Sequence, residues 1–536
     1  MFGHAILKIS EFVKVFMVEQ KLKKLPLGLT TFSEIIRDDY VYVDKTESIY
    51  QLVTGGKYYF LSRPRRFGKS LLVSTLTEFF SGNRELFKHL WIGQSDYDWP
   101  VHPVIRFDFS EMSSFSVQCL QEDIIGIINE IAALYGIEVP ASKTTITGKF
   151  KSLIIQLSKI NKVVILIDEY DKPILDHIDN PEEAKAQREI LKSLYSVIKG
   201  SDQYLKFVLL TGVSKFAKTS VFSGINNLSD ISMDRRYATM LGYLRDELGI
   251  YFGDYLERFS KKLSISVNEL ETKLVNYYDG YHFTKESAPV FNPYSVMLSL
   301  DAQEIEDYWF KTGTPTFLVK LLRKHDYDVD TVTHPVINKA SLDAFEPDDI
   351  ELAALLFQTG YLTIKGYDSA TGNYTLGVPN REVSDGLTIQ LVDAFTGLQA
   401  NKSIQYAQRI FKTFVDGDMT KLEQVLQEFF NKMPYTVHVK SESQLQFVLY
   451  AIFALIGVTV DPEVTTSLGR ADLVVGFPKL VYVIELKFNK TAHEALEQIQ
   501  DKKYYEKYEN IDKQITLVGI NFDSETKTVS LESQVI

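Results

Sequence analysis

The strongest indication of the fold is the stretch Tyr58-Tyr-Phe-Leu-Ser-Arg-Pro-Arg-Arg-Phe-Gly-Lys-Ser-Leu-Leu72. Its apolar, aromatic first part predicts a buried strand, Phe67-Gly68 predicts a tight turn, and the spacing from Leu71 to Phe80 predicts a helix. A strand, a glycine-containing loop and a helix that opens on Gly-Lys-Ser provide the context of a phosphate-binding loop. Free N–H groups at such a helix start attract anions, so we expect nucleotide phosphates to meet Arg66, Phe67, Gly68, Lys69, Ser70 and Leu71.

The loop departs from the pattern G-x-x-x-x-G-K-[ST], because Arg63 stands where the first glycine belongs. Pro64 restricts the backbone of this loop, and Arg63, Arg65 and Arg66 add positive charge to it. Lys69 is placed to reach the β- and γ-phosphates, and Ser70 to ligate Mg²⁺. A chance Gly-Lys-Ser in an ordinary strand–helix turn is the alternative, and the downstream sequence argues against it.

A second apolar run, Lys162-Val-Val-Ile-Leu-Ile-Asp168-Glu169-Tyr-Asp171, predicts a strand that ends in acids, as in a Walker B motif. We expect Asp168 to hold Mg²⁺ through water at the carboxyl end of the strand. Successive side chains of a strand point to opposite faces, so Glu169 is expected to polarise the attacking water as a catalytic residue. A strand that simply ends in solvated acids is the alternative, which the upstream phosphate loop makes weaker.

Two further strands complete the predicted sheet. Pro103–Phe109 is one, and it is followed by a long helical region from about Ser116 to Ile160. Phe207–Gly212 is the other, and Thr211 near its tip is suited to sense the γ-phosphate or the hydrolytic water. Strands that alternate with helices in this way predict a P-loop α/β sandwich.

Composition limits the class of protein. The chain has 536 residues, which predicts two to four domains, and its 45% hydrophobic and 24% charged residues are typical of globular proteins. A net charge of −12 argues against non-specific coating of nucleic acid but allows a local basic groove. The single cysteine, Cys119, excludes an internal disulfide framework and fits a reducing cytoplasm. The absence of a long apolar run predicts no membrane helix.

The N-terminal part adds two expectations. Met1–Gln20 is apolar but is interrupted by charges, so we expect an amphipathic extension rather than a signal peptide, with Met17 as an alternative start. Phe32 or Tyr42, which precede the phosphate loop, could pack over a nucleotide base. Plain packing in the core is the favoured alternative for both aromatic rings.

Several motifs in fixed order carry a resemblance to a known family. They are Leu25-Pro-Leu-Gly28, Tyr42-Val-Asp-Lys-Thr46, Arg63–Leu71, Ile167–Asp171, Thr211–Phe216, Ser220–Leu228, Tyr278–Phe283, Phe291–Tyr294 and Tyr308–Phe317. This set resembles the AAA-type ATPase domain of a bacterial family whose members usually carry a PD-(D/E)XK nuclease-like domain at the C-terminus. The resemblance implies that ATP binds to a loop without the first glycine.

The expected order of domains follows. Residues 1–24 form an extension, 25–240 the AAA-like P-loop ATPase core, and 241–330 a helical lid in which Thr312-Gly-Thr-Pro-Thr316 begins a helix. Residues 331–431 form a winged-helix-like and helical connector, because a helix over 350–359 precedes a β-hairpin over 361–378. The local charge is not strongly basic, so protein interaction or linkage is favoured over DNA binding for this connector. Residues 432–536 form the nuclease-like domain.

The C-terminal domain carries the second predicted chemistry. Asp472 precedes Leu-Val-Val, and after a turn comes Leu480-Val-Tyr-Val-Ile-Glu485-Leu-Lys487, which matches the PD-(D/E)XK signature with Ala471 in place of the proline. Period-two alternation puts Glu485 and Lys487 on one face, and the hairpin brings Asp472 beside Glu485. Two carboxylates can then hold Mg²⁺, or Mn²⁺ in its place, and Lys487 can position a water or offset negative charge.

The helix after this hairpin is expected to complete the site. Thr491-Ala-His-Glu494 is a capping box. The family resemblance places Gln498 and Tyr504-Tyr505 in this helix, with Gln498 facing the site, and Glu442 is a candidate for a further carboxylate. A surface hairpin with scattered charges, or a fold that persists without cleaving anything, are the alternatives.

Two functions remain open on sequence alone. The first is an ATP-dependent endonuclease, an ATPase coupled to a metal-dependent phosphodiesterase that acts on nucleic acid, with DNA favoured over RNA. The second is a STAND-like ATP-driven signalling switch whose nuclease-like domain binds rather than cleaves. The intact set of Asp472, Glu485, Lys487 and Gln498 favours the first. A homo-oligomer is compatible with either, and Arg235 and Arg236 are candidate arginine fingers.

Overall fold

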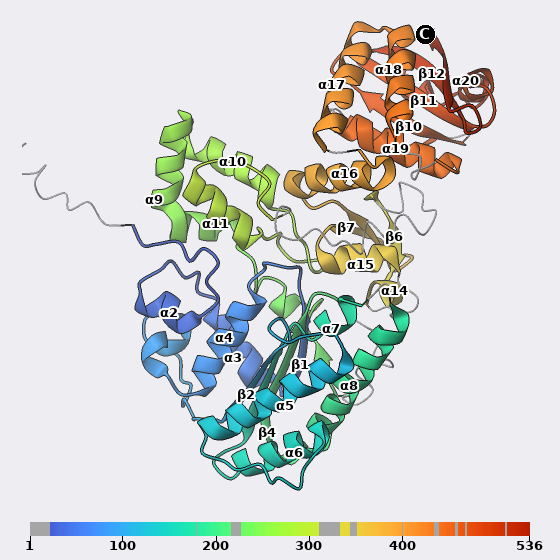
Figure 1. Ribbon diagram of the computed structural model, residues 1–536. Coiled ribbons are helices and arrows are strands. Elements are labelled where there is room, and N and C mark those ends of the chain that lie inside the picture. Colours follow the sequence, from blue (N-terminus) through green and yellow to red (C-terminus); the bar gives the residue numbers. More distant parts are fainter. Residues whose placement is uncertain are drawn as a thin grey trace, which may run out of the picture.

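The computed structural model describes residues 22–177, 180–215, 227–309, 333–343, 351–398, 400–433, 439–455, 459–466, 469–509 and 512–536. The expected N-terminal extension, Met1–Gln20, and the expected helix start over Thr312–Thr316 lie outside these residues. In chain order the described residues form an N-terminal α/β domain, a helical lid, a middle region and a C-terminal α/β domain (Figure 1). No helix among them combines the length and apolar character that crossing a membrane requires.

A parallel five-stranded sheet is the centre of the N-terminal domain, with strand order β2-β3-β4-β1-β5. Strand β4 lies between β1, which leads into the predicted phosphate loop, and β3, which ends in the predicted acids. The carboxyl ends of these strands therefore meet at one edge, where open α/β sheets bind ligands. The strands are β1 Tyr58–Ser62, β2 Val104–Asp108, β3 Val163–Asp168, β4 Leu205–Gly212 and β5 Ser229–Asp230.

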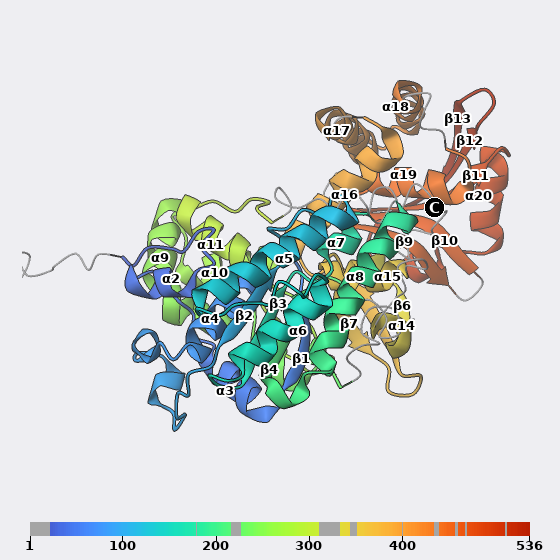
Figure 2. The ribbon, with the colours of Figure 1, turned by 60° about the horizontal axis from the view of Figure 1, so that its bottom comes forward.

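Helices cover both faces of this sheet, as the alternation of strands and helices predicts. One face packs against α5, α6 and α8, which lie side by side in Figure 2, and the other packs against α2, α3 and α4. The helices are α2 Phe32–Arg37, α3 Thr46–Gly55, α4 Lys69–Phe80, α5 Val117–Leu134, α6 Ile146–Leu157, α7 Lys172–Leu175 and α8 Pro181–Lys199. The predicted P-loop α/β sandwich is thus confirmed.

The prediction of one helical region from Ser116 to Ile160 was wrong in its middle. Two helices form there, and the chain leaves α5 through Gly136, whose φ of +64° is a conformation that glycine adopts without strain. Pro140 follows, and proline does not continue a helix. The second helix, α6, has its own N-cap, because the Thr145 hydroxyl accepts the Gly148 N–H.

In the described part of the expected lid, residues 241–309, three helices pack on one another and on the segment before β1. Leu248 and Leu274 of the lid share a core with Val41 and Val43 of that segment. The lid helices are α9 Arg245–Leu263, α10 Val267–Tyr278 and α11 Pro293–Ala302. The N-terminal segment therefore connects the lid to the rim of the sheet.

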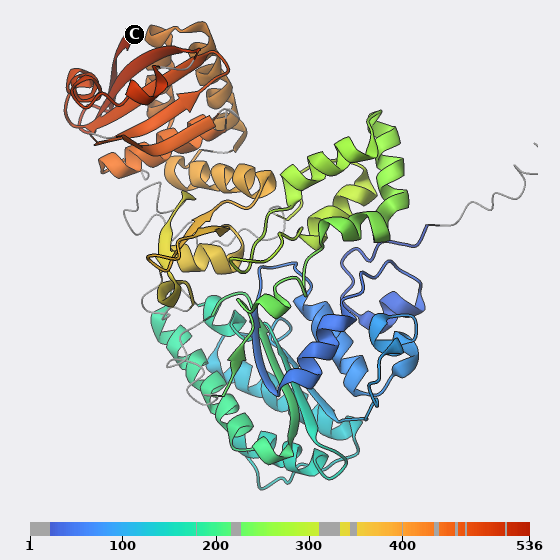
Figure 3. The same ribbon diagram turned by 180° about the vertical axis from the view of Figure 1, so that it is seen from behind.

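The middle region contains the predicted helix followed by a hairpin. Helix α15 ends at Gly360 with φ +90°, and the hairpin strands β7 and β8 pair antiparallel, with β6 added at the edge. In Figures 1 and 3 this region lies between the N-terminal domain and the C-terminal domain. Its elements are β6 Val336–Asn338, α14 Lys339–Asp343, α15 Leu352–Thr359, β7 Thr363–Tyr367, β8 Asn373–Gly377 and α16 Arg381–Thr396.

The C-terminal domain is a mixed sheet with helices on both faces, in the order β13-β12-β11-β10-β9. The β11–α20–β12 crossover joins two parallel strands, and the predicted capping box of Thr491 and Glu494 opens α20. Helix α20 covers one face, and α19 covers the other together with α17 and α18, which were expected to belong to the connector. The elements are α17 Ala400–Asp416, α18 Met419–Lys432, α19 Glu442–Ala454, β9 Thr459–Thr466, β10 Gly469–Gly476, β11 Leu480–Phe488, α20 Ala492–Asp501, β12 Gln514–Asp523 and β13 Thr528–Val535.

Candidate functional site

The predicted phosphate loop, Arg63–Gly68, connects the end of β1 to the start of α4. Gly68 caps α4 with φ +93°, and no atom lies within 4 Å of the place where a Cβ would stand. Arg66 also has a positive φ, +66°, so the loop turns sharply before the helix. The free N–H groups of the first turn of α4 are thereby open to the cavity beside the loop, as an anion site requires.

Lys69 lies under this loop and is almost fully buried. Its ammonium donates to the carbonyl oxygens of Arg63, at 2.9 Å, and Pro64, at 3.0 Å. Burial lowers the pKa of Lys69, and the carboxylates of Glu169 and Asp168 oppose that shift. The ammonium is therefore held by main-chain oxygens at the place where phosphates would compete for it.

The acids that follow β3 take different roles in the fold. Asp168 is fully buried; its Oδ1 accepts the Thr211 hydroxyl and the Glu169 N–H, whereas its Oδ2 has no hydrogen-bond partner within the described part of the chain. A buried carboxylate oxygen without a partner fits a site for an ion or its water. Thr211, predicted as a phosphate sensor, lies in the structure as the partner of Asp168.

Glu169 and Asp171 continue the same turn. Glu169 has φ +50°, and burial raises the pKa of its carboxyl while the Lys69 ammonium opposes the shift. Asp171 is buried and accepts the N–H groups of Val213 and Ser214 together with the Ser214 hydroxyl. Asp171 therefore ties the acidic turn to the end of β4. No local pattern marks this contact, because its partners lie about forty residues away.

A cavity of about 630 Å³ opens beside Lys69, Glu169 and Asp171 and is large enough for a nucleotide, but neither Asp168 nor Thr211 lines it. All six predicted loop residues, Arg66 to Leu71, line it together with Glu169, although the Phe67 ring itself is buried against Tyr281 and Phe283. Apolar and aromatic groups form the rest of the wall, including Tyr42, Ile49, Met240, Tyr243, Tyr294 and Met297. Such a wall suits a base and ribose next to phosphates.

The two aromatic rings considered for base stacking differ in position. Phe32 is fully buried and packs against Phe87, whereas Tyr42 lines the cavity. Arg66 lies over the Tyr294 ring at 4.9 Å, so a cation and an aromatic ring already meet at this wall. Arg235 and Arg236, the candidate arginine fingers, are exposed and form ion pairs with Glu286 and Asp234.

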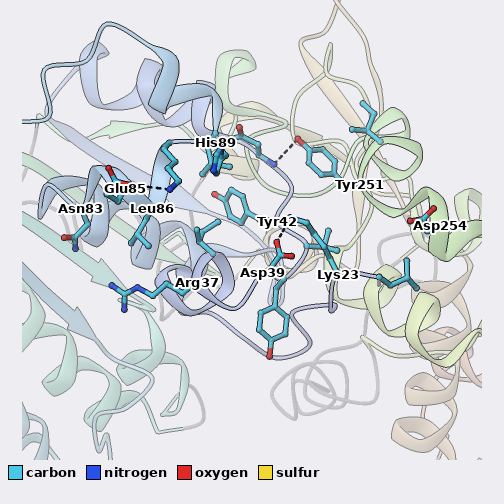
Figure 4. A pocket seen from close by; sticks show the side chains of 18 of the residues that line it. Lys23, Arg37, Asp39, Tyr42, Asn83, Glu85, Leu86, His89, Tyr251 and Asp254 are labelled. Atoms are coloured by element: carbon cyan, nitrogen blue, oxygen red, sulfur yellow. Dashed lines mark hydrogen bonds and ion pairs between the residues drawn. The ribbon is translucent and has the colours of Figure 1, made fainter. Parts of the chain in front are cut away.

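A second cavity of about 1140 Å³ lies on the other side of Tyr42, between the N-terminal segment and α9 (Figure 4). It contains no residue of the phosphate loop. Apart from His89, its charged lining is balanced, with the bases Lys23, Arg37, Arg84 and Lys88 and the acids Asp39, Asp44, Glu85 and Asp254. The loop residues predicted to bind phosphate therefore line the smaller cavity and not the larger one.

The second candidate site lies on the C-terminal sheet, where β10 and β11 run antiparallel. Leu473 pairs with Ile484, so Asp472 and Glu485 follow as the next residues of the two strands. Asp472 accepts the Leu486 N–H at 2.7 Å, which fixes its carboxylate beside β11. The predicted pair of carboxylates is thus brought together.

Glu485 is the most deeply buried acid of this site, with 2% of its surface exposed. Its Oε1 accepts the Lys487 ammonium at 3.1 Å and the Gln498 amide from α20, and its Oε2 is buried without a hydrogen-bond partner among the described residues. Burial, followed by the nearby charge of Asp472, raises the pKa of the Glu485 carboxyl. This environment favours a cation close to Oε2.

Lys487 is surrounded by acceptors. Its ammonium contacts Glu485, the Leu486 carbonyl at 3.0 Å and, more loosely, Glu442 of α19 at 3.8 Å. Burial alone would lower its pKa, but Glu485 and Glu442 outweigh burial and raise it. The ammonium therefore stays charged beside the carboxylates.

Two further side chains support the set from neighbouring helices. Gln446 of α19 donates to the Asp472 carbonyl at 2.9 Å, and the Tyr504 hydroxyl accepts from Gln498 at 3.2 Å. Tyr504 and Tyr505 were expected in the same helix as Gln498, but α20 ends at Asp501 and Lys503 has φ +48°. That turn brings the Tyr504 hydroxyl back to Gln498. Gln446 was missed because nothing local marks it.

A metal at this site would have few protein ligands. Within the described ranges, no group of three or more His, Cys, Asp and Glu side chains is arranged to hold an ion. The residues present would supply two carboxylates, Asp472 and Glu485, and leave the remaining positions to water and substrate. Hard divalent cations such as Mg²⁺ commonly keep several waters in this way.

Comparison with known proteins agrees with this division. Residues 26–222 match the family model described as a predicted AAA-ATPase, and residues 440–532 match a model of the PD-(D/E)XK nuclease superfamily. A protein of Azotobacter chroococcum mcd 1, described as an uncharacterized protein in the vnfD 5′ region, is 38% identical over 522 residues. The match covers 95% of this chain and 98% of that relative.

Proposed function

Because this chain belongs to the family that joins a predicted AAA-ATPase domain to a PD-(D/E)XK nuclease superfamily domain, we propose that it is an ATP-dependent nuclease. In this proposal the N-terminal domain binds and hydrolyses ATP, and the C-terminal domain cleaves phosphodiester bonds of nucleic acid with Mg²⁺ or Mn²⁺. DNA is the first substrate to test. The two activities are coupled through the middle region.

The first site supports the ATPase half of the proposal. The N–H groups at the start of α4 and the Lys69 ammonium hold the phosphates, while Mg²⁺ is held by Ser70 and by Asp168, whose Oδ2 has no hydrogen-bond partner among the described residues. Glu169 orients the attacking water and accepts its proton. The raised pKa of the Glu169 carboxyl suits a group that takes up a proton during turnover.

The second site supports the nuclease half. Asp472 and Glu485 would hold the divalent ion; when bound, it lowers the pKa of a water and polarises the scissile phosphate. Lys487 places a positive charge beside the carboxylates, where negative charge develops in the transition state. Gln498 fixes the rotamer of Glu485 from α20.

One observation carries the proposal most directly. Glu485 is buried with one carboxylate oxygen bound by Lys487 and Gln498 and the other without a partner in the described part of the chain. A buried, unpartnered carboxylate oxygen destabilises a domain unless it serves a ligand. A domain that only binds a protein partner has no use for this arrangement.

The experiment that tests the proposal is a cleavage assay on supercoiled DNA, linear DNA, single-stranded DNA and RNA. Each substrate is incubated with Mg²⁺ or Mn²⁺, with and without ATP, using the wild type, Glu485→Ala and Lys69→Ala. We expect the wild type to cleave at least one of these substrates. Glu485→Ala should abolish cleavage, and Lys69→Ala should abolish the response of cleavage to ATP. Cleavage that survives Glu485→Ala would contradict the assignment of the site.

A specific observation favours a second candidate, an ATP-driven switch of the STAND-like kind. Residues 431–536 contain 14 Asp and Glu against 11 Lys and Arg, so this domain has a net charge of −3. An acidic domain attracts nucleic acid poorly. ATP turnover without cleavage of any polymer would support this second function.

A further inference from the structure

Trp309 connects the phosphate loop to the middle region. Its indole N–H donates to the Arg65 carbonyl at 3.1 Å across 244 residues of sequence, and its ring lies 5.4 Å from that of Tyr361, next to the end of α15. Only 5% of Trp309 is exposed. The indole is therefore a buried donor directed at the backbone of the loop that would hold the phosphates.

Glu382 fixes the main chain of this tryptophan. Its Oε1 accepts the N–H groups of Tyr308 and Trp309, both at 2.6 Å, and its Oε2 accepts the Ser295 hydroxyl of α11 at 2.8 Å. Glu382 lies in the first turn of α16 and is fully buried. One carboxylate thus joins the lid, the segment of Trp309 and the helix that leads away from the ATPase domain.

Three successive carbonyls of the phosphate loop are engaged by two different side chains. The Lys69 ammonium donates to the carbonyls of Arg63 and Pro64. The Trp309 indole N–H donates to the carbonyl of Arg65. Phosphates that bind to Lys69 compete with the first two contacts. If nucleotide binding shifts the loop, the Arg65 carbonyl and the Trp309 indole that donates to it would therefore move as well.

The loop also packs directly on the middle region. Gly360, with φ +90°, lies so close to the Pro64 ring that an added Cβ would stand 2.7 Å from Pro64 Cβ. Gln358 of α15 accepts the Lys215 N–H just beyond β4. The middle region thus forms part of the wall behind the phosphate loop, and little space separates the two.

We propose that Trp309 is a positioning residue of the phosphate loop, that Glu382 holds it from α16, and that nucleotide binding changes its indole contact. This inference rests on the proposed binding of ATP to the loop. Helix α16 packs against α19, whose Gln446 and Glu442 contact the second site. The state of the nucleotide is thereby communicated toward the C-terminal domain.

Tryptophan fluorescence tests the inference, because the chain has three tryptophans, Trp91, Trp99 and Trp309. In the full chain with Trp91→Phe and Trp99→Phe, emission reports on Trp309 alone. Binding of Mg–ADP and Mg–ATP is measured in parallel by calorimetry. We expect an emission change that saturates with the calorimetric Kd, and we expect that Trp309→Phe removes this component from the wild-type signal.

Activity provides a second readout. Trp309→Phe keeps an aromatic ring but removes the donor, and we expect kcat of ATP hydrolysis to fall about three- to tenfold, the equivalent of one hydrogen bond, with KM nearly unchanged. Trp99→Phe is the matched control, because Trp99 is also buried and its indole N–H has no partner among the described residues. Glu382→Gln, which can still accept both N–H groups, should preserve the emission response, and Glu382→Ala should abolish it.

The outcomes separate the two proposals. Nucleotide binding without any change in Trp309 emission, together with unchanged kcat in Trp309→Phe, overturns this inference and leaves the ATPase assignment intact. Absence of calorimetric binding overturns the ATPase assignment and this inference with it. Equal losses of kcat in Trp309→Phe and Trp99→Phe show a general packing defect and also overturn the positioning role.

Discussion

The Lys487 ammonium lies 3.1 Å from Glu485 Oε1, and these two residues, two positions apart on β11, are both buried. Their contact leaves Glu485 Oε2 without a hydrogen-bond partner in the described structure. The pair thus combines a fixed cation with an available carboxyl oxygen. This is the chemical basis of the proposed metal-dependent cleavage, and Gln498 is the side chain that keeps the pair oriented.

Removal of Gln498 tests that orientation. We predict that Gln498→Ala lowers metal-dependent cleavage about ten- to hundredfold, because it frees the carboxylate that would ligate the ion. Gln500→Ala is the control, since Gln500 lies on the same helix but contacts the exposed Gln534. The measurement is the initial rate of substrate cleavage at saturating Mn²⁺. Equal rates for both variants would show that Gln498 does not position Glu485.

Removal of the loop lysine tests the nucleotide site. We predict that Lys69→Ala weakens Mg–ATP binding about ten- to hundredfold, the usual effect of losing a charge-assisted hydrogen bond. Lys57→Ala is the control, because Lys57 precedes β1 and pairs with Asp202 instead. Calorimetric titration measures both. An unchanged Kd in Lys69→Ala would place the nucleotide elsewhere.

The contact between Gly360 and Pro64 can be tested by a pair of glycine substitutions. Both Gly360 and Gly372 have positive φ, but a Cβ at Gly372 would meet nothing within 4 Å. We predict that Gly372→Ala costs about 1 kcal/mol of folding free energy from backbone strain, and that Gly360→Ala costs about 1–3 kcal/mol more. Urea denaturation measures the difference. Only Gly360→Ala should also lower ATP hydrolysis, and equal effects of the two variants would argue against the contact.

Because the Glu382 carboxyl is buried, we predict that the free energy of unfolding depends on pH. Burial raises the pKa of this carboxyl to about 7, although three donors oppose the shift. The unfolded chain releases this proton near pH 4.5 and the folded chain only near pH 7, so the folded state loses stability as pH rises through that window. The loss amounts to about 3 kcal/mol by pH 8.

Glu382→Gln removes the proton and keeps the acceptor for Tyr308 and Trp309. Urea-unfolding midpoints between pH 5 and pH 8 should therefore fall with rising pH in the wild type and fall less steeply in this variant. Parallel curves would show that Glu382 does not titrate in this range. Glu382→Ala should be less stable at every pH, because it leaves two main-chain N–H groups without their acceptor.

The features that the sequence predicts well are local. The phosphate loop is marked by residues adjacent in the chain, and Glu485 and Lys487 follow from the two-residue period of one strand. Asp472 could be placed beside Glu485 because a short hairpin fixes the register of its strands. In each case the physics that forms the element also positions the side chain.

The features that the sequence does not predict depend on long-range packing. Trp309 meets Arg65, Asp171 meets Ser214 and Gln446 meets Asp472 only after distant elements dock, and no local period marks these pairs. The assignment of Phe67 shows the same limit. Phe67 lines the cavity with the rest of the loop, but its ring packs against Tyr281 and Phe283, and no local pattern marks that contact.

In the proposed function, the carboxyl pair Asp472 and Glu485 of the C-terminal domain serves the cleavage of nucleic acid. The most direct measurement compares the wild type with Glu485→Gln, which keeps the shape and loses the charge, in cleavage of supercoiled DNA with Mn²⁺ and ATP. Glu532→Gln on strand β13, which β12 separates from β11, is the control. We predict cleavage by the wild type and the control, and a loss of at least about 100-fold in Glu485→Gln. Equal cleavage by all three proteins, or cleavage that persists in EDTA, would contradict the claim.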